Sequence, residues 1–222
     1  AAPTSTNAPL RTSPGEGILL IPFLTDLSWA AETPGGMRPA DQQRALTVWI
    51  FAVAFPDFFK TKPVLIFEGA PGSGKSSALQ IIQQTIHGRP RPLLLSKNGE
   101  ANFPTQILRT PIAVLDNTDT YIEWLPDAVC GYATGAVFTK RKLYTDDAEY
   151  EIQPHSFLAV ASKNPASFRR EDTADRTIVL RLDRYAPGTF VPMTELTRRV
   201  HKNRRKLYGE WIYILNKIVH EL

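Results

Sequence analysis

The sequence predicts an α/β protein in which a parallel five-stranded β-sheet lies between two layers of helices. Short apolar runs alternate with segments of helical periodicity along most of the chain, an order typical of a parallel sheet covered on both faces. A glycine-rich loop separates the first of these runs from the helix after it, which is the setting of a phosphate-binding site. With 43% hydrophobic residues among 222, the chain can bury one substantial core.

The chain divides into four predicted parts, of which the first is an arm. Residues 1–17 are rich in Ala, Pro, Thr, Ser and Gly, so they cannot offset their ordering entropy by burial and are expected to be disordered. Residues 18–60 hold a helix over 39–55, because apolar side chains recur there at helical spacing. Residues 61–190 form the core, and residues 191–222 form a basic helix that we expect to be truncated.

Five strands and three helices are predicted within the core. The apolar runs place the strands at 64–67, 93–95, 112–115, 157–161 and 177–182. The helices are expected at 75–87, 103–109 and 122–132. Residues 136–153 are predicted to form a β-hairpin inserted before the fourth strand, because turn-rich residues join two strand-like segments there.

Composition and charge exclude several classes of protein. The single cysteine, Cys130, excludes an internal disulfide framework and a cysteine-based zinc site. No apolar run approaches the ~20 residues needed to cross a bilayer, and the N-terminus lacks the order of a secretory signal. We therefore expect a soluble, cytoplasmic protein without a membrane partner. The net charge of +4 includes a basic cluster over 198–206, which permits binding of a polyanion.

The glycine-rich loop is the most informative motif of the chain. Its glycines let the main chain wrap phosphates without steric cost, and successive N–H groups with the positive end of the following helix supply an anion site. Lys75 should reach the β- and γ-phosphates, and the Ser76 hydroxyl should bind Mg²⁺. The sequence therefore predicts a Mg-ATP site formed by Gly69, Ala70, Pro71, Gly72, Ser73, Gly74, Lys75, Ser76 and Ser77.

An acidic residue is also needed to hold the metal and orient the attacking water. Asp116 follows the third strand, in the Walker B position, where its carboxylate would bind Mg²⁺ through water. The next residue is Asn117, which can orient a water but cannot accept its proton. Asp119 or Glu123 could supply the missing base. We favour Asp119, for which capping of the following helix is the alternative role.

The order of these motifs resembles the AAA+ class, and within it the superfamily 3 helicases and the poxvirus-type primase-helicases of viruses, phages and plasmids. The resemblance covers roughly residues 63–184. Its carriers are the phosphate loop, Asp116, the hairpin with Arg141-Lys142-Leu143-Tyr144, the strand closed by Ser162-Lys163-Asn164-Pro165, and Ala174-Asp175-Arg176 ahead of the fifth strand.

The resemblance implies roles for further polar residues. Sensor 1, a polar side chain that touches the γ-phosphate or the attacking water, would be Asn164, with Ser162 as the alternative. The arginine finger, which reaches the nucleotide of a neighbouring subunit, would be Arg176, with Arg169 and Arg170 as rivals. A simple turn at Asn164 and a surface ion pair of Arg176 are the competing interpretations.

The hairpin is the feature that makes such an ATPase a candidate DNA motor. In the family, hairpins of this kind line the channel of a ring, where basic residues grip phosphates. Lys140, Arg141 and Lys142 are therefore expected to contact nucleic acid. The predicted tip, Asp146-Asp147, is acidic and would repel phosphate, so the contact should come from the flank of the hairpin.

The resemblance thus implies a superfamily 3-like helicase domain that forms a homo-oligomeric ring, expected to be a hexamer. Such a ring would couple ATP hydrolysis to movement on single-stranded DNA during replication of a mobile element, phage or plasmid. One alternative is an ATP-driven switch or remodeller that acts on a protein partner. Another is a nucleotide-binding scaffold with little hydrolysis, which Asn117 in place of the usual base makes plausible.

Overall fold

The computed structural model describes residues 23–24, 26–108, 110–141, 149–189 and 191–221. The expected N-terminal arm lies outside the described residues, as do Lys142 and the acidic hairpin tip. The chain divides into two compact units. Unit 1 comprises Ala1–Phe51, Gly69–Pro90 and Arg181–Leu222, and unit 2 comprises Ala52–Glu68 and Arg91–Leu180.

A five-stranded sheet has the strand order β2-β3-β6-β1-β7. Its strands are β1 (Val64–Gly69), β2 (Pro92–Leu93), β3 (Ile112–Asp116), β6 (Phe157–Ser162) and β7 (Thr177–Leu182). The pairs β1–β6, β3–β6 and β2–β3 are parallel. Every residue of β6 is buried, as expected of a strand that is covered on both faces. The predicted parallel five-stranded sheet is therefore confirmed.

One face of the sheet packs against helices in the core of unit 2. Alternate residues of β1, β3 and β6 lie on this face, because successive strand side chains point to opposite sides. They meet the apolar side chains of α4 (Phe103–Ile107) and α5 (Leu125–Ala133). The most buried members of this core are Val64, Ile66, Phe103, Ile107, Ala113, Leu115, Leu125, Val129, Tyr132, Ala133, Leu158 and Val160.

Several elements of unit 2 differ in extent from those predicted. α5 begins at Leu125 rather than at residue 122, because Pro126 lacks an N–H and fits only the first turn of a helix. β2 is shorter than predicted, and α4 ends at Ile107. The four-residue α6 (Glu171–Ala174) was not predicted. Three short 3₁₀ helices are η1 (Pro56–Phe58), η2 (Glu100–Asn102) and η3 (Ala166–Phe168).

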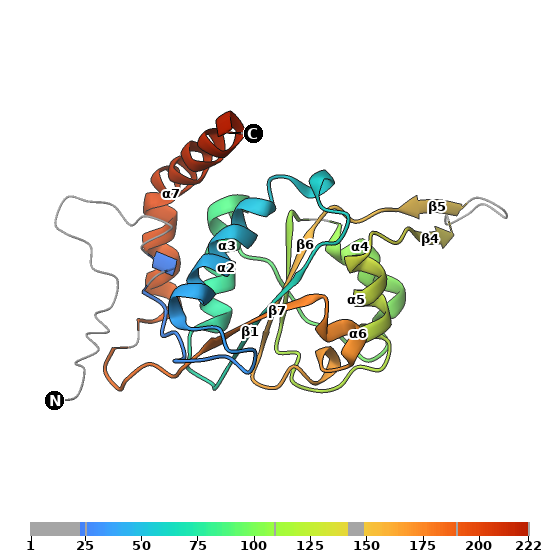
Figure 1. The fold of residues 1–222 in the computed structure, drawn as a ribbon, viewed down its shortest axis with the longest axis horizontal. Helices are drawn as coiled ribbons and strands as arrows, with labels where there is room; N and C mark the ends of the chain where they lie inside the picture. The colour runs from blue at the N-terminus through green and yellow to red at the C-terminus, as the bar shows by residue number, and fades with distance from the viewer. Residues whose placement is uncertain (1–22, 25, 109, 142–148, 190, 222) are drawn as a thin grey trace. The chain divides into compact units, whose positions relative to one another are not determined.

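Two further strands form a separate two-stranded sheet. β4 (Phe138–Arg141) lies beside β5 (Glu149–Ile152) and pairs with it in antiparallel orientation (Figure 1). In this register Lys140 is opposite Tyr150. The residues that would join them lie outside the described part of the chain. Both strands come between α5 and β6, the place at which the hairpin was expected.

The long helices α2 (Pro39–Ala52), α3 (Lys75–His87) and α7 (Met193–Glu221) belong mainly to unit 1. α3 and α7 lie side by side (Figure 1). Gly88, with a φ of 88°, closes α3 by donating its N–H to Gln84 O. Arg204 of α7 donates from Nε to the same oxygen at 3.0 Å. A cation at the negative end of a helix is stabilising, so Arg204 serves as a cap of α3.

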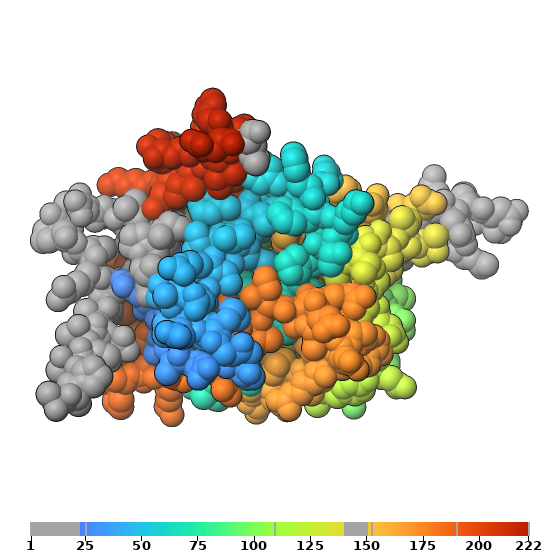
Figure 2. Space-filling model, in the orientation of Figure 1, coloured from blue at the N-terminus to red at the C-terminus, as the bar shows by residue number. Residues whose placement is uncertain are grey.

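The basic cluster of α7 is only partly free for other partners. Arg198 and Arg199 both form ion pairs with Glu195, whereas Lys202 and Arg205 are exposed. The last turns of α7, red in Figure 2, lie on the surface in that view.

Across the described ranges, no helix combines the length and apolar character that crossing a membrane requires.

Candidate nucleotide-binding site

The phosphate loop lies between the last residue of β1 and the first residue of α3, in unit 1. Gly72 and Gly74 have φ values of 81° and 83°, a left-handed conformation that strains residues with a Cβ atom. The N–H of Ser73 donates to Ala70 O at 3.2 Å, which closes the loop into a turn. Lys75 Nζ donates to the same carbonyl at 3.3 Å, so its cation lies over the loop.

The side chains of the loop fit a polyphosphate and its metal. The buried Ser73 hydroxyl has no hydrogen-bond partner among the described residues, so it is available to another group. Ser76 and Ser77 are half-buried in the first turn of α3. A hydroxyl, a lysine and main-chain N–H groups at a helix start are the donors that suit a nucleotide with Mg²⁺.

In unit 2, Asp116 is the last residue of β3 and pairs in register with Ala161 of β6. The turn after it is unusual, because Asn117 has a φ of 59°. No other non-glycine residue in the described ranges has a positive φ. Its N–H lies 3.0 Å from Asp116 Oδ1 and 3.1 Å from Ala161 O. Asparagine tolerates this conformation better than glutamate does, which gives a physical reason for Asn117 in place of the usual acid.

Asp119 is bound to the end of β6. Its Oδ1 accepts hydrogen bonds from Ser162 Oγ at 2.8 Å and from the N–H of Lys163 at 2.7 Å. Its Oδ2 lies 3.8 Å from Lys163 Nζ. Burial alone would raise the pKa of Asp119, but these hydrogen bonds and the ammonium group hold that pKa below its usual value. Asp119 is therefore ionised at neutral pH, with its oxygens already bound.

The two sensor candidates differ in exposure. Ser162 is fully buried, and its hydroxyl lies within hydrogen-bond distance of Thr118 O as well as of Asp119. Asn164 is exposed, and its N–H donates to Ser162 Oγ at 3.1 Å. Ser162 thus connects the turn after β3 with the segment after β6. Of the two candidates, Asn164 has the side chain that a ligand can reach.

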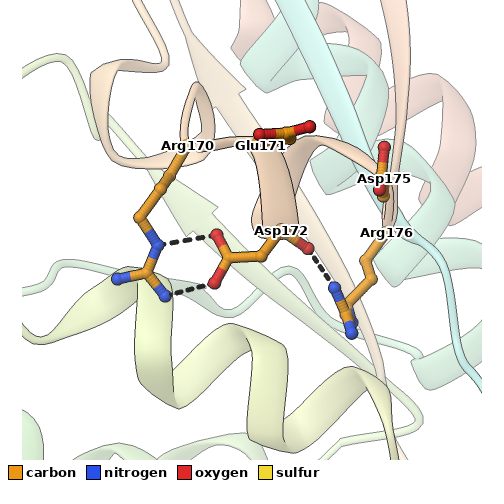
Figure 3. A pocket seen from close by; sticks show the side chains of 5 residues that line it. All are labelled: Arg170, Glu171, Asp172, Asp175 and Arg176. Atoms are coloured by element: carbon orange, nitrogen blue, oxygen red, sulfur yellow. Dashed lines mark hydrogen bonds and ion pairs between the residues drawn. The ribbon is translucent and has the colours of Figure 1, made fainter.

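Two of the arginine candidates, Arg170 and Arg176, line a pocket of about 490 Å³ in unit 2 (Figure 3). Arg170 forms two hydrogen bonds with the Asp172 carboxylate and a third with Asp127. Its guanidinium lowers the pKa of Asp172 to about 2. Arg176 instead donates to the main-chain oxygen of Asp172, and Arg169 is exposed. Arg170 is thus paired with two carboxylates, whereas Arg176 is held by a neutral carbonyl that a phosphate could displace.

Comparison with known proteins adds the family. The family model described as actinomycete integrative conjugative element replication protein matches residues 37–218. The chain belongs to this family. No curated protein matches the chain.

Solved structures show which fold the replication protein shares. The apo A form of the NrS-1 C-terminal region is similar at 15% identity, with a TM-score of 0.58 over 95% of this chain and 48% of that chain. This chain therefore spans about half the length of that region. A JCV helicase structure matches at 11% identity over 88% of this chain and 59% of that one, but its TM-score of 0.44 is too low to support an argument. The family is thus one of replication proteins of a mobile element, and the likeness to the NrS-1 region shows a shared fold.

The predicted site residues of this replication protein are distributed over both units. The loop residues, Ser76 among them, belong to unit 1, and the other candidates belong to unit 2. Unit 2 brings Asp119 to the end of β6, and Asp116 and Asn117 belong to the same turn. The described residues contain no group of three or more His, Cys, Asp or Glu that could hold a metal. Mg²⁺ in a nucleotide site needs fewer protein ligands, because phosphates and waters complete its shell.

One segment that lies at the loop was not predicted from the sequence. A Cβ atom on Gly69 would lie 2.4 Å from the carbonyl oxygen of Leu182, the last residue of β7. No motif marks this segment, and the contact joins residues far apart in the chain. The absence of a side chain at Gly69 is the local signal that another chain segment approaches closely.

Proposed function

We propose that this replication protein is an ATP-dependent motor, a superfamily 3-like AAA+ helicase domain that acts on nucleic acid. The observation that carries the proposal is the phosphate loop, with its two left-handed glycines and Lys75 at the start of α3. An acidic residue, Asp116, ends the strand β3 of the parallel sheet. The family adds that the context is replication of a mobile element.

Each proposed residue has a defined role in ATP hydrolysis. The N–H groups of the loop bind the phosphates, and Lys75 offsets the charge of the β- and γ-phosphates. Ser76 and Asp116 are the residues that would hold Mg²⁺, which would neutralise phosphate charge when bound. Asn117 and Asn164 orient the attacking water by hydrogen bonding.

Asp119 is better suited to positioning than to proton transfer. A general base works best with a pKa near the working pH, whereas the pKa of Asp119 is lowered by bonds to its two neighbours. These bonds fix the turn after β3 to the end of β6, which carries Asn164. Asp119 would then keep the two asparagines at the distance that a water requires.

Substitutions of Asp119 distinguish these two roles. We expect Asp119→Asn to slow hydrolysis by up to about 10²-fold, because misplacement of the water lowers the rate, and to slow it more than Glu123→Gln does. Asp119→Asn retains an acceptor oxygen, so it should be less impaired than Asp119→Ala. Steady-state turnover across pH 5–9 measures both effects.

The pH profile provides the control for Asp119. A positioning role leaves the shape of the profile unchanged and lowers only its height. Equal loss in the two variants, with disappearance of an acidic limb, would instead identify Asp119 as the base. Small and equal effects at Asp119 and Glu123 would leave Asn117 or a residue of a neighbouring subunit as the group that positions the water.

The nucleic-acid contact is proposed for the flank of the hairpin. Lys140 and Arg141 belong to β4, and Lys142 follows them in the sequence. In the proposed ring, expected to be a hexamer, these cations would grip the backbone of single-stranded DNA. ATPase turnover with and without single-stranded DNA, together with protein mass in the presence of an ATP analogue, tests this function. We expect DNA to stimulate turnover and the analogue to promote assembly.

The double variant Lys140→Ala with Lys142→Ala tests the contact itself. We expect weaker binding to single-stranded DNA of every sequence, with a salt slope shallower by about 1.4 for two lost phosphate contacts. Basal ATPase should persist. The charge-removing changes Asp146→Asn and Asp147→Asn should leave DNA binding equal or stronger.

The C-terminal helix supplies the comparison for this test. Arg205→Ala removes an exposed cation of α7, whereas Arg204→Ala would also uncap α3. Loss of DNA binding in Arg205→Ala alone would place the contact on α7. If the wild type shows no salt-dependent DNA binding, the helicase proposal fails and an ATPase that remodels a protein partner becomes the better account.

A further inference from the structure

The chain that follows β7 runs against the phosphate loop within unit 1. A Cβ atom on Gly72 would lie 3.6 Å from Nε and 3.8 Å from Cγ of Arg184. A Cβ atom on Gly74 would lie only 2.8 Å from Cε2 of Tyr185. Two glycines of the loop therefore pack directly on these two side chains.

The N-terminal part of unit 1 holds this segment in place. Asp183 N–H donates to Ser28 O at 2.7 Å, and Ala30 N–H donates to Arg181 O at 2.9 Å. The main chain of Ser28 also hydrogen-bonds the Tyr185 side chain. The segment is thus fixed by main-chain bonds on both sides of Leu182, so its approach to the loop does not depend on flexible side chains.

Tyr185 supports the shape of the loop and stays uncharged. Burial raises the pKa of Tyr185, and the Ser28 main chain lowers it only in part. A neutral ring edge therefore lies against Gly74, whose left-handed φ of 83° precedes α3. The ring fills the space that a side chain at this position would need, so it packs against the left-handed turn that Gly74 makes before α3.

Arg184 presents a positive charge at the same loop. The side chain is exposed, and it has no hydrogen-bond or ion-pair partner within the described ranges. Its neighbour Asp183 is also exposed and is the nearest opposite charge in the chain sequence. A guanidinium offers a planar fork of donors that matches two phosphate oxygens. An arginine packed on a phosphate loop, with these donors available, is suited to bind the anion that the loop holds.

We propose that Arg184 binds the phosphate chain of the nucleotide held by the loop of its own subunit. The inference rests on the proposed function, because it requires a nucleotide at the loop. Arg184 follows β7, the last strand of the sheet in chain order, and it adds a second cation to that of Lys75. It acts within one chain, unlike the arginine finger proposed for Arg176.

Direct binding of Mg-ADP and Mg-ATP to the purified protein tests this residue. Calorimetric titration of the wild type is compared with Arg184→Gln, Arg184→Lys and Lys75→Ala. We expect Arg184→Gln to lower the affinity for both nucleotides about 10-fold, because hydrogen bonds to charged groups are lost. Arg184→Lys should lose less, since it keeps the charge without the fork. The matched control Arg38→Gln removes another exposed arginine of unit 1 and should bind as the wild type does.

The outcomes separate this inference from the function on which it rests. Wild-type affinity in Arg184→Gln, with loss in Lys75→Ala, would overturn the role of Arg184 and leave the nucleotide site intact. Absence of nucleotide binding by the wild type would overturn both. Mixing Arg184→Gln with Lys75→Ala protein should not restore tight binding, and restoration would show that Arg184 acts on a neighbouring subunit instead.

Discussion

Arg176→Ala protein is expected to bind ATP with nearly wild-type affinity and to hydrolyse it about 10³-fold more slowly. A guanidinium supplied by a neighbouring subunit stabilises charge that develops in the transition state, so its loss affects the rate rather than binding. Arg176 is suited to this role because, among the described residues, its side chain donates only to the carbonyl of Asp172. Phosphate release and nucleotide titration measure the two quantities separately, and wild-type turnover per subunit should rise with concentration.

Complementation decides whether Arg176 acts between subunits. A mixture of Arg176→Ala with Lys75→Ala protein should regain activity, because about a quarter of the interfaces in a random equal mixture combine an intact loop with an intact arginine. Arg169→Ala and Arg170→Ala serve as comparisons. If the two inactive proteins co-assemble without regaining activity, Arg176 acts within its own subunit or is only structural.

Lys75→Ala should bind ATP about 10- to 100-fold more weakly, because it removes a charged hydrogen bond to the terminal phosphates. Turnover should fall by at least about 10²-fold, since this cation also stabilises transferred charge. Binding of a fluorescent ATP analogue and release of phosphate measure the two effects. Asp116→Ala should retain more of the nucleotide affinity and lose chiefly the metal-dependent hydrolysis.

The control for this prediction is another lysine. Lys60→Ala removes an exposed side chain of unit 2 that we place in no site, and it should leave binding and turnover unchanged. Unchanged turnover in Lys75→Ala would show that the loop is not the nucleotide site. In that event the proposed function would fail along with the assignment of Lys75.

The sequence by itself predicted the features that depend on neighbouring residues. The strands β1, β3, β6 and β7 lie within a residue or two of their predicted bounds, and α3 has the bounds predicted. Burial periodicity and glycine conformation act over a few residues, so they can be recognised without a fold. The glycine-rich loop could be recognised as a candidate phosphate site for this reason, since its nine residues are contiguous.

The start of α5 and the conformation of the turn at Asn117 were harder to predict from local sequence patterns. Pro126 permitted more than one helix start, and only its place in the first turn selects Leu125. The sequence showed an asparagine where an acid was expected. The positive φ of Asn117 supplies the reason, because the turn must adopt a conformation in which both its N–H contacts can form.

Only the tertiary structure decided which distant polar groups meet. Asp119 bonds the end of β6, and Arg170 bonds Asp127 across 43 residues of sequence. Arg204 caps α3, and Arg184 packs on Gly72 of the phosphate loop. Each contact depends on the order of the strands and on the packing of the helices. Neither can be predicted from the hydrophobic periodicity of a single segment. Charge and residue type were readable along the chain, but the partner that gives each charge its role is chosen by the fold.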